Sequence, residues 1–382
     1  MKNNRTFLEK LLDGAEVEWK PLKDILIRTK GTKITAAEMK ILHKDNAPLK
    51  IFAGGKTFAL VNFEDIPEKD INKNPSIIVK SRGIIEFEYY DKPFSHKNEM
   101  WSYYSNDKNI NIKYIYYVLK NQEPYFQNLG SKMQMPQIAT PDTDKYLVPI
   151  PPLPVQTEIV KILDALTALT SELTSELTSE LILRRKQYEY YREKLLSFDS
   201  LEQLNMGGAK KKLIDVAIIG TGSRNTNEAI ENGIYPFFVR SQEPKKINEY
   251  EFDETAIITA GDGVGVGKVF HYISGKYALH QRAYRIVVTD KNLLPKFLFH
   301  YIRNNFAHYL KMTSVNSSVT SLRKPMFEKY PVFVPPLEEQ HRIVSILDKF
   351  ETLTNSITEG LPLAIEQSQK RYEYYRELLL SF

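Results

Sequence analysis

The chain has 382 residues, which is enough for two or three domains that each bury a core of their own. Its formal net charge of +5 is mildly basic and permits nucleic-acid binding without requiring it. Cysteine is absent, so disulfides and cysteine-based zinc sites are excluded, and no apolar run approaches the length of a membrane span. With a charged amino-terminal stretch that lacks the apolar centre of a secretion signal, this composition predicts a cytoplasmic protein.

The first 145 residues alternate short strand-like runs with turns. Aromatic and β-branched residues are concentrated in the runs, and glycine, proline and asparagine separate them. A more continuous apolar segment then has the length of a helix. We expect strands over residues 49–52, 58–63, 76–79 and 83–89 and a helix over 111–121, which together predict a compact α+β domain built on a sheet.

A long repeat comes next and dominates the sequence. Residues 145–198 and 329–382 align without a gap at an offset of 184, and 27 of the 54 positions are identical. Each copy opens with prolines, which reject helix and force an extended start. Apolar residues then recur at steps of three and four, which predicts long helices over residues 155–198 and 338–382. One helix of that length cannot bury its own apolar stripe, so the two copies should pack together as a coiled coil.

The first copy carries the tetrapeptide Thr-Ser-Glu-Leu three times in succession, from Thr170 to Leu181. Each unit adds about 6 Å of helix, and successive leucines advance by about 40° around it. The tract is either a product of replication slippage that a helix surface tolerates or a spacer of adjustable length. The second copy is not continuous, because Gly360 and Pro362 should kink or interrupt its helix. We expect a slowly winding apolar line at Leu169, Leu173, Leu177 and Leu181.

Residues 199–328 return to the style of the first block and predict a second α+β domain. The two blocks are only faintly similar in sequence. His96 and His280 lie at the offset of the long repeat, which predicts that they occupy equivalent positions. We expect strands over residues 235–240, 255–259, 267–272 and 284–288 and a helix over 296–304.

A glycine-rich run from Gly261 to Lys268 suggests a phosphate loop. The pattern Gly-x-x-x-x-Gly-Lys-Ser/Thr needs a glycine and a hydroxyl where the chain has Asp262 and Val269. A flexible loop at a strand edge explains the glycines more simply. A nucleotide-dependent enzyme that uses the Gly261–Lys268 loop is one alternative function, and a coiled-coil scaffold that binds proteins is another. No catalytic residue and no metal-ligand spacing is identified.

Two motifs are common to the two repeats. Each repeat begins Lys-Tyr-x-Val-x-x-Pro-Pro-Leu-x-x-Gln-x-x-Ile-Val-x-Ile-Leu-Asp and ends with Tyr-Glu-Tyr-Tyr-Arg-Glu. With variable blocks between such repeats, the chain resembles the specificity subunits of type I restriction-modification systems. The resemblance implies target-recognition domains over residues 1–145 and 199–328, and conserved spacer helices over 146–198 and 329–382. It also implies that these helices form an antiparallel coiled coil within a pseudo-two-fold internal repeat.

The family resemblance implies a function and partners as well. Each target-recognition domain would bind one half of a bipartite site in double-stranded DNA, and the helix pair would set the spacer between the halves. The chain would have no active site and no cofactor of its own. It would recruit two modification subunits, which supply S-adenosylmethionine and methylate adenine, and through them restriction subunits that use ATP and Mg²⁺. The number of tetrapeptides controls the spacer in this family, which favours the adjustable-spacer explanation.

The residues that read DNA follow no fixed motif in this family, so the candidates come from chemistry alone. Basic and amide side chains in polar loops can pair with phosphates and base edges. In the first domain the candidates are Arg28, Lys30, Lys33, Arg82, Lys97, Gln134 and Gln137. In the second domain they are Arg224, Arg240, Lys268, Gln281, Arg282, Asn316 and Arg323.

The tyrosines near the end of each repeat divide into two groups. Tyr190 and Tyr374 lie off the apolar face of their helices and are predicted to contact a partner protein. The residues on the apolar face, which should lie inside the helix pair, are Tyr188, Tyr191, Leu195, Tyr372, Tyr375 and Leu379.

Overall fold

Two units make up the chain. The structure, a computed structural model, describes residues 7–131, 135–197, 201, 208–313, 321–356 and 359–382. Unit 1 comprises Met1–Ser175 and Glu366–Phe382, and unit 2 comprises Glu176–Ile365. The helix α7 (Leu153–Leu196) begins in unit 1 and ends in unit 2, whereas α13 (Gly360–Leu380) begins in unit 2 and ends in unit 1. Each unit therefore combines one variable block with the start of one repeat and the end of the other.

Unit 1 contains three small sheets. Its strands are β1 (Glu18–Pro21), β2 (Ile27–Thr29), β3 (Leu49–Phe52), β4 (Phe58–Val61), β5 (Ser76–Lys80), β6 (Glu86–Tyr90), β7 (Phe94–His96), β8 (Trp101–Tyr104) and β9 (Leu147–Ile150). An antiparallel sheet has the order β2-β8-β5-β6, and a mixed sheet has the order β4-β3-β7. The pair β1 and β9 ties the amino-terminal segment to the proline-rich start of the first repeat.

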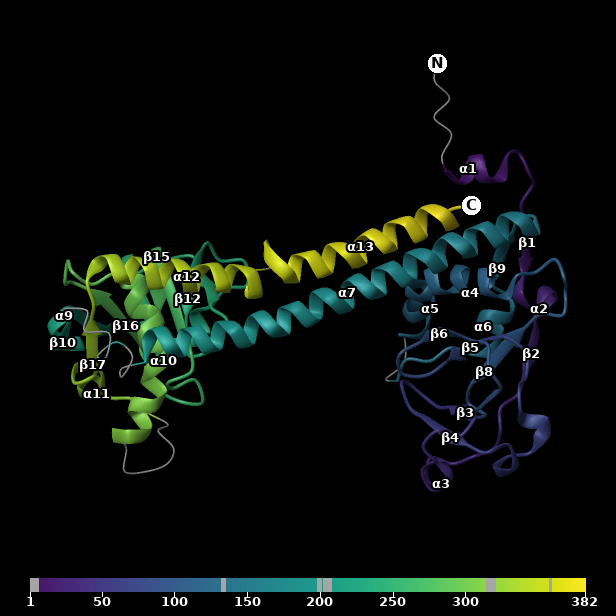
Figure 1. The fold of residues 1–382 in the computed structure, drawn as a ribbon, viewed down its shortest axis with the longest axis horizontal. Helices are drawn as coiled ribbons and strands as arrows, with labels where there is room; N and C mark the ends of the chain where they lie inside the picture. The colour runs from purple at the N-terminus through teal and green to yellow at the C-terminus, as the bar shows by residue number, and fades with distance from the viewer. Residues whose placement is uncertain (1–6, 132–134, 198–200, 202–207, 314–320, 357–358) are drawn as a thin grey trace, which may run out of the picture. The chain divides into compact units, whose positions relative to one another are not determined.

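The helices of unit 1 are divided between its sheets, with the helix Ala36–Leu42 against β4 and the helix Ile112–Asn121 against β5 and β6. They are α1 (Phe7–Leu12), α2 (Leu22–Ile25), α3 (Ala36–Leu42), α4 (Ile112–Asn121), α5 (Glu123–Gly130) and α6 (Thr140–Asp144), with 3-10 turns η1 (Phe63–Asp65) and η2 (Glu68–Asp70). The helix α4 lies between that sheet and the first part of α7 (Figure 1). Its buried Tyr114, Ile115 and Leu119 join the sheet residues Ile77 and Val79 in the main core.

Unit 2 joins the equivalent strands into one six-stranded sheet of order β11-β16-β14-β15-β12-β13. Its strands are β10 (Ala209–Lys212), β11 (Ala217–Thr221), β12 (Tyr235–Phe238), β13 (Lys245–Ile247), β14 (Phe252–Ala260), β15 (Phe270–Leu279), β16 (Ala283–Val288) and β17 (Pro331–Val334). The strands β10 and β17 form the separate pair that corresponds to β1 and β9. The helical segments are α9 (Leu213–Val216), η3 (Thr226–Glu228), α10 (Pro295–Thr313), α11 (Lys324–Glu328) and α12 (Leu337–Asn355).

One long strand of unit 2 corresponds to two separate strands in unit 1. The strand β15 pairs antiparallel with β14 and parallel with β12, whereas in unit 1 β6 pairs with β5 and β7 pairs with β3. Between β6 and β7 lies Pro93, which has no backbone N–H to donate to a neighbouring strand. Residues 91–93 correspond to residues 274–276 of β15, where Gly275 at φ +115° adopts a conformation that lets the strand continue.

The strand register corrects the expected equivalence of His96 and His280. The backbone N–H of Lys97 donates to Phe52 O, and that of His280 donates to Phe238 O, at 2.9 Å in both cases. The partner of His280 in unit 1 is therefore Lys97, and His96 corresponds to Leu279. The offset at this turn is one residue shorter than that of the long repeat, because the stretch between the turn and the repeat is one residue longer in unit 2.

The glutamine of the Pro-Pro-Leu-x-x-Gln motif has the same structural task in both units. Gln156 Oε1 accepts from Asn111 N at 2.9 Å, and its Nε2 donates to the carbonyls of Asn109 and Pro151. Gln340 makes the corresponding three bonds, with Leu294 N and with the carbonyls of Asn292 and Pro335. Both side chains are fully buried, so each fastens the start of a repeat helix to the loop before α4 or α10.

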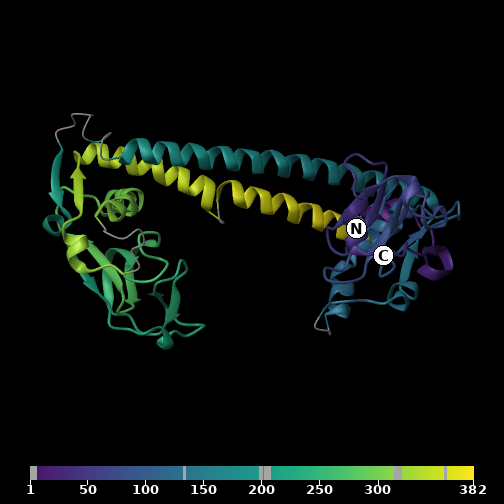
Figure 2. The same ribbon diagram turned by 90° about the horizontal axis from the view of Figure 1, so that it is seen from below.

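Antiparallel contacts join the repeat helices inside each unit, which confirms the expected coiled coil. In unit 1, Thr167 Oγ1 and Tyr372 OH lie 3.1 Å apart. In unit 2 the mirrored pair is Tyr188 OH and Glu351 Oε1 at 2.9 Å, and Arg185 reaches Thr354 O. Figure 2 shows the last part of α13 beside the first part of α7 in unit 1.

The burial of the four tetrapeptide leucines agrees with the expected winding of their line around the helix. Leu169 and Leu173 are exposed by 63% and 42%, while Leu177 and Leu181 are half-buried. An advance of about 40° per tetrapeptide carries the leucines around the helix, so only part of the line can face the partner helix. The interruption of the second repeat is confirmed, because α12 ends at Asn355 and α13 begins at Gly360.

Candidate nucleic-acid interface

An acidic residue held between two arginines marks one edge of the sheet in unit 2. Asp262 follows β14, Arg240 follows β12, and Arg282 lies in the turn between β15 and β16. The two guanidinium groups reach opposite oxygens of the carboxylate, Arg240 at 2.8 Å and Arg282 at 3.1 Å. Partial burial works to raise the pKa of Asp262, but hydrogen bonds and charge from the arginines hold that pKa below its usual range.

Gln281 and Arg224 lie beside this Arg240–Asp262–Arg282 cluster. The backbone of Arg224 pairs with the turn at His280, and Gln281 Nε2 donates to Asn225 Oδ1 at 2.6 Å. Glu228 and Glu249 neutralise the Arg224 guanidinium, at 3.0 and 2.7 Å. The structure thus brings together four of the seven candidates of the second domain. Arg240, Gln281 and Arg282 are the exposed ones among them.

The other candidates of the second domain are less clearly placed. Arg323 is exposed directly before α11, and Ser321 nearby pairs in the backbone with Asp262. Lys268 is exposed on the glycine-rich loop. Asn316 lies outside the described residues.

The glycine-rich loop does not have the form of a nucleotide-binding loop. A phosphate loop leads from a strand into the positive end of a helix, but this loop leads from β14 into the strand β15. The carboxylate of Asp262 is held by arginines, and Val266 and Val269 are buried. The loop therefore connects β14 to β15 and holds Asp262 between the two arginines at the edge of the sheet.

Unit 1 has a charge cluster at the corresponding place, with the signs exchanged. Arg82 pairs in the backbone with Gln137, as Asp262 does with Ser321, and Glu99 occupies the turn position of Arg282. Lys97 Nζ lies 2.7 Å from Glu99 Oε1. Burial works to raise the pKa of Glu99, but the hydrogen bond from Lys97 and the charges of Lys97 and Arg82 hold it below its usual range. Gln134, the neighbouring candidate, lies outside the described residues.

The remaining candidates of the first domain lie on or just after β2. Arg28 and Lys30 line a cavity of about 660 Å³, where Arg28 pairs with Asp144 at 2.5 Å. Lys33 is exposed beside a smaller cavity of about 320 Å³. Lys69 and Asn72 line the larger cavity too, although sequence reasoning missed both. Their signal was weak, since one lysine and one asparagine in a turn are ordinary.

The helices α10 and α12 bring together three side chains that could hold a metal ion. Their spacing along the sequence did not indicate such a group. His300, Asp348 and Glu351 offer ligand atoms within 4.8 Å of one another. Both carboxylates already have cationic partners, Lys296 at Asp348 and Arg303 at Glu351. Unit 1 places Lys113, Tyr117 and Asp164 in the same arrangement, with no histidine. This group is therefore a polar contact that attaches each domain to its repeat helix.

The tyrosines divide differently from the expected pattern. Tyr188 is buried and Tyr372 is half-buried, as expected. Tyr191 is exposed by 37% although its ring stacks on Phe350, and its counterpart Tyr375 is also exposed, so the interior position expected for these two is wrong. Tyr190 and Tyr374 are the most exposed of the six tyrosines, at 57% and 60%.

Comparison with known proteins gives consistent results. The model of the type I restriction modification DNA specificity domain matches residues 15–182 and 207–367. A putative type I restriction enzyme specificity subunit of Haemophilus influenzae, S.HindORF215P, is 38% identical, with 100% of both chains covered. The specificity subunit of the type I restriction enzymes EcoR124I and EcoR124II of Escherichia coli is 34% identical over 99% of this chain and 97% of its own length.

Solved structures share the fold at low sequence identity. The HsdS subunit of Thermoanaerobacter tengcongensis matches with a TM-score of 0.54 at 14% identity, over 96% of this chain and 95% of its own. A chain from a study of complex assembly and conformational transition of the type I R-M system gives a TM-score of 0.57 at 14% identity, over 95% and 97%.

Proposed function

The chain belongs to the DNA specificity subunits of type I restriction-modification systems, and on that premise we propose that each unit reads one half of a bipartite DNA site. It is the DNA specificity subunit of a type I restriction-modification system and has two target-recognition domains. In the type I complex it is the non-catalytic subunit. The family carries no cofactor of its own. The chain assembles into a type I complex that binds DNA.

The observation that carries the half-site proposal is the pair of charge clusters at one sheet edge. Both clusters use the same backbone positions, but unit 1 places Arg82 opposite Glu99 where unit 2 places Asp262 opposite Arg282. Arginine recognises guanine through its two acceptors, and carboxylates accept from cytosine. The two units thus place residues of opposite charge at equivalent positions. This difference is what we expect of two related domains that recognise different DNA sequences.

The repeat helices are proposed to carry the remaining functions. Two modification subunits dock on them and supply S-adenosylmethionine, and restriction subunits with ATP and Mg²⁺ join through those. The three Thr-Ser-Glu-Leu units set the number of unread base pairs between the half-sites. Tyr190 and Tyr374, exposed at equivalent places of the repeat, are proposed as docking residues for the modification subunits.

The test of the half-site proposal is to sequence the methylated sites of a host that expresses this chain with its modification subunit. The wild type should give one bipartite site. The structurally matched variants Glu99→Gln and Arg282→Gln should each alter or relax one half-site, and not the same half. An undivided site, or variants that alter the same half, would contradict the assignment of one half-site to each unit.

A further inference from the structure

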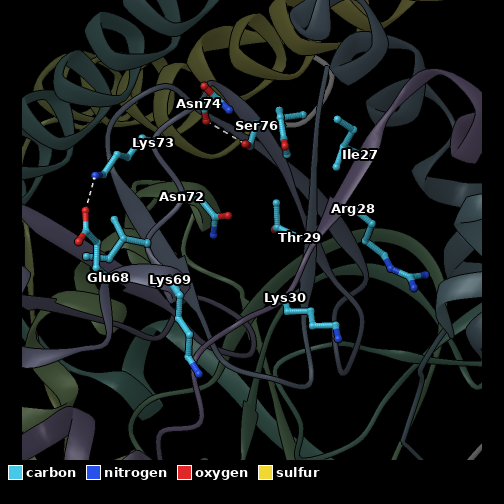
Figure 3. Close-up of a pocket in the computed structure, with 12 residues that line it drawn as sticks. Ile27, Arg28, Thr29, Lys30, Glu68, Lys69, Asn72, Lys73, Asn74 and Ser76 are labelled. Carbon is cyan, nitrogen blue, oxygen red and sulfur yellow. Dashed lines mark hydrogen bonds and ion pairs between the residues drawn. The ribbon is translucent and has the colours of Figure 1, made fainter. Parts of the chain in front are cut away.

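A cavity of about 660 Å³ opens in unit 1 between β2, the end of β8 and the segment that leads into β5. Polar donors dominate its lining: the lysines, Arg28, Asn72 and the hydroxyls of Thr29, Ser76 and Tyr104. Figure 3 shows the Asn72 carboxamide near the middle of these residues, with the ammonium groups of Lys30 and Lys69 extended on the same side of it.

The positive charge of the cavity is only partly neutralised. Arg28 pairs with Asp144, and Lys73 pairs with Glu68 at 3.0 Å. Lys30 and Lys69 are exposed and pair with no carboxylate among the residues that the structure describes. Two ammonium groups therefore face the same cavity without a counter-charge.

A buried donor in the cavity also lacks an acceptor. Asn72 Nδ2 is shielded from solvent and has no hydrogen-bond partner among the described residues. An unsatisfied buried amide is destabilising relative to a satisfied one. An acceptor-rich ligand in the cavity would supply the missing partner once the shielded carboxamide turns towards it.

Unit 2 shows that this fold does not require the cavity. Asn72 faces Phe94 across an antiparallel bridge, and the residue in the same place of unit 2, opposite Tyr277, is Phe252. The Phe252 ring lies 4.4 Å from the guanidinium of Arg285, which is itself paired with Glu254 at 2.7 Å. A neutral, filled contact thus replaces the open and positively charged space of unit 1.

We propose that the cavity of unit 1 binds a phosphate group of the DNA backbone. This inference rests on the proposed function, because it assigns a contact of the same DNA complex. A phosphate has no donor to offer and accepts from ammonium and amide groups, which are the groups that Lys30, Lys69 and Asn72 present. Unit 1 therefore contacts the DNA backbone at a position where unit 2 has no equivalent contact.

The experiment measures binding of the full chain to a short DNA duplex at several salt concentrations. Two variants remove the site: Lys30→Gln with Lys69→Gln, which changes exposed residues only, and Asn72→Phe, which installs the residue of unit 2. The slope of log K against log salt should become shallower by about 0.9 for each lost phosphate contact, with binding about tenfold weaker near 0.1 M salt. Lys161→Gln, an exposed lysine on α7, is the control and should leave the slope unchanged.

A second arm separates backbone phosphate from free phosphate compounds. Inorganic pyrophosphate and ATP are titrated into the same proteins, and thermal unfolding is recorded. Weak stabilisation by pyrophosphate that both cavity variants lose supports the proposal. If ATP binds tightly and the salt slope for DNA is the same in all proteins, the ligand is a free nucleotide and the assignment to DNA is overturned.

The two proposals fail in different ways. Wild-type protein that binds DNA with the same salt slope as both cavity variants refutes the phosphate site and leaves the half-site proposal intact. Wild-type protein that does not bind DNA at any salt concentration refutes the function on which the site rests.

Discussion

Arg376 Nε donates to Asn121 Oδ1 at 3.1 Å, although 255 positions separate the two residues in the chain. The end of α13 is thereby fastened to α4 of the first domain. The same bond occurs in unit 2, where Arg192 Nε donates to Asn304 Oδ1 at 3.1 Å. Each domain is thus held by the end of the repeat that follows the other domain.

Removing a leucine at the end of α13 should therefore destabilise unit 1 in particular. Leu379 is buried in the main core of unit 1, so Leu379→Ala should cost about 2–5 kcal/mol of unfolding free energy. Hydrogen exchange should show the loss of protection in α4 and not in α10. Leu183→Ala, at an exposed leucine of α7, is the matched control and should have a small effect. Equal loss of protection in α10 would contradict the closure of unit 1 by α13.

Stability should fall in mildly acidic solution because of His96. Burial lowers the pKa of this fully buried ring, whose Nδ1 donates to Lys97 O at 3.0 Å. The unfolded state binds the proton more readily than the folded state does. The contribution of the neutral His96 ring to stability is therefore complete above the unfolded pKa of about 6.5, and it is lost as the pH falls towards the lower pKa of the folded state. Urea unfolding between pH 8 and pH 5 should show this decline in the wild type and less of it in His96→Asn. His341→Asn, at an exposed histidine, should retain the full decline.

Neutralising Asp262 should strengthen DNA binding but not its selectivity. Asp262→Asn releases Arg240 and Arg282 from their common carboxylate, so non-specific affinity should rise several-fold and the salt slope should steepen by about 0.9 for a new phosphate contact. Binding to competitor DNA across a salt series gives both quantities. Asp253→Asn makes the same change of charge at an exposed residue of β14. An equal gain in that control would mean that net charge alone is responsible.

Truncating the exposed tyrosines should weaken assembly without unfolding the chain. Tyr190→Ala and Tyr374→Ala each remove an aromatic anchor, and such anchors contribute more than about tenfold in affinity where they are central to an interface. Pull-down of the modification subunit at graded concentrations measures the loss. Tyr125→Ala, at a tyrosine of α5 that is exposed by 50%, should bind normally. Undiminished assembly of both repeat variants would exclude these tyrosines from the docking surface.

Local periodicity predicted the main elements well. The first repeat helix was expected over residues 155–198 and is Leu153–Leu196, and the strand expected over 49–52 is β3. Proline and glycine also predicted the break between α12 and α13. These features depend on neighbours within a few residues, which a single sequence displays directly.

Long-range contacts could not be predicted in the same way. Nothing local indicates that Arg376 meets Asn121, or that β1 pairs with β9 across the whole first domain. The candidate residues were chosen as single cations and amides, so Asp262 and Glu99, the acids that organise them, were missed. Only the strand register shows that Asp262 is equivalent to Arg82 of unit 1 and that Glu99 is equivalent to Arg282 of unit 2.

Deleting one tetrapeptide tests whether the repeat sets the distance between two independent half-sites. Deletion of Thr174–Leu177 shortens the helix by about 6 Å, which corresponds to one or two base pairs of DNA at about 3.4 Å each. Methylated sites should then be sequenced in hosts that carry the deleted or the complete chain. The deleted chain should give a changed spacer between two unchanged half-sites. Altered half-sites with a constant spacer would contradict this prediction.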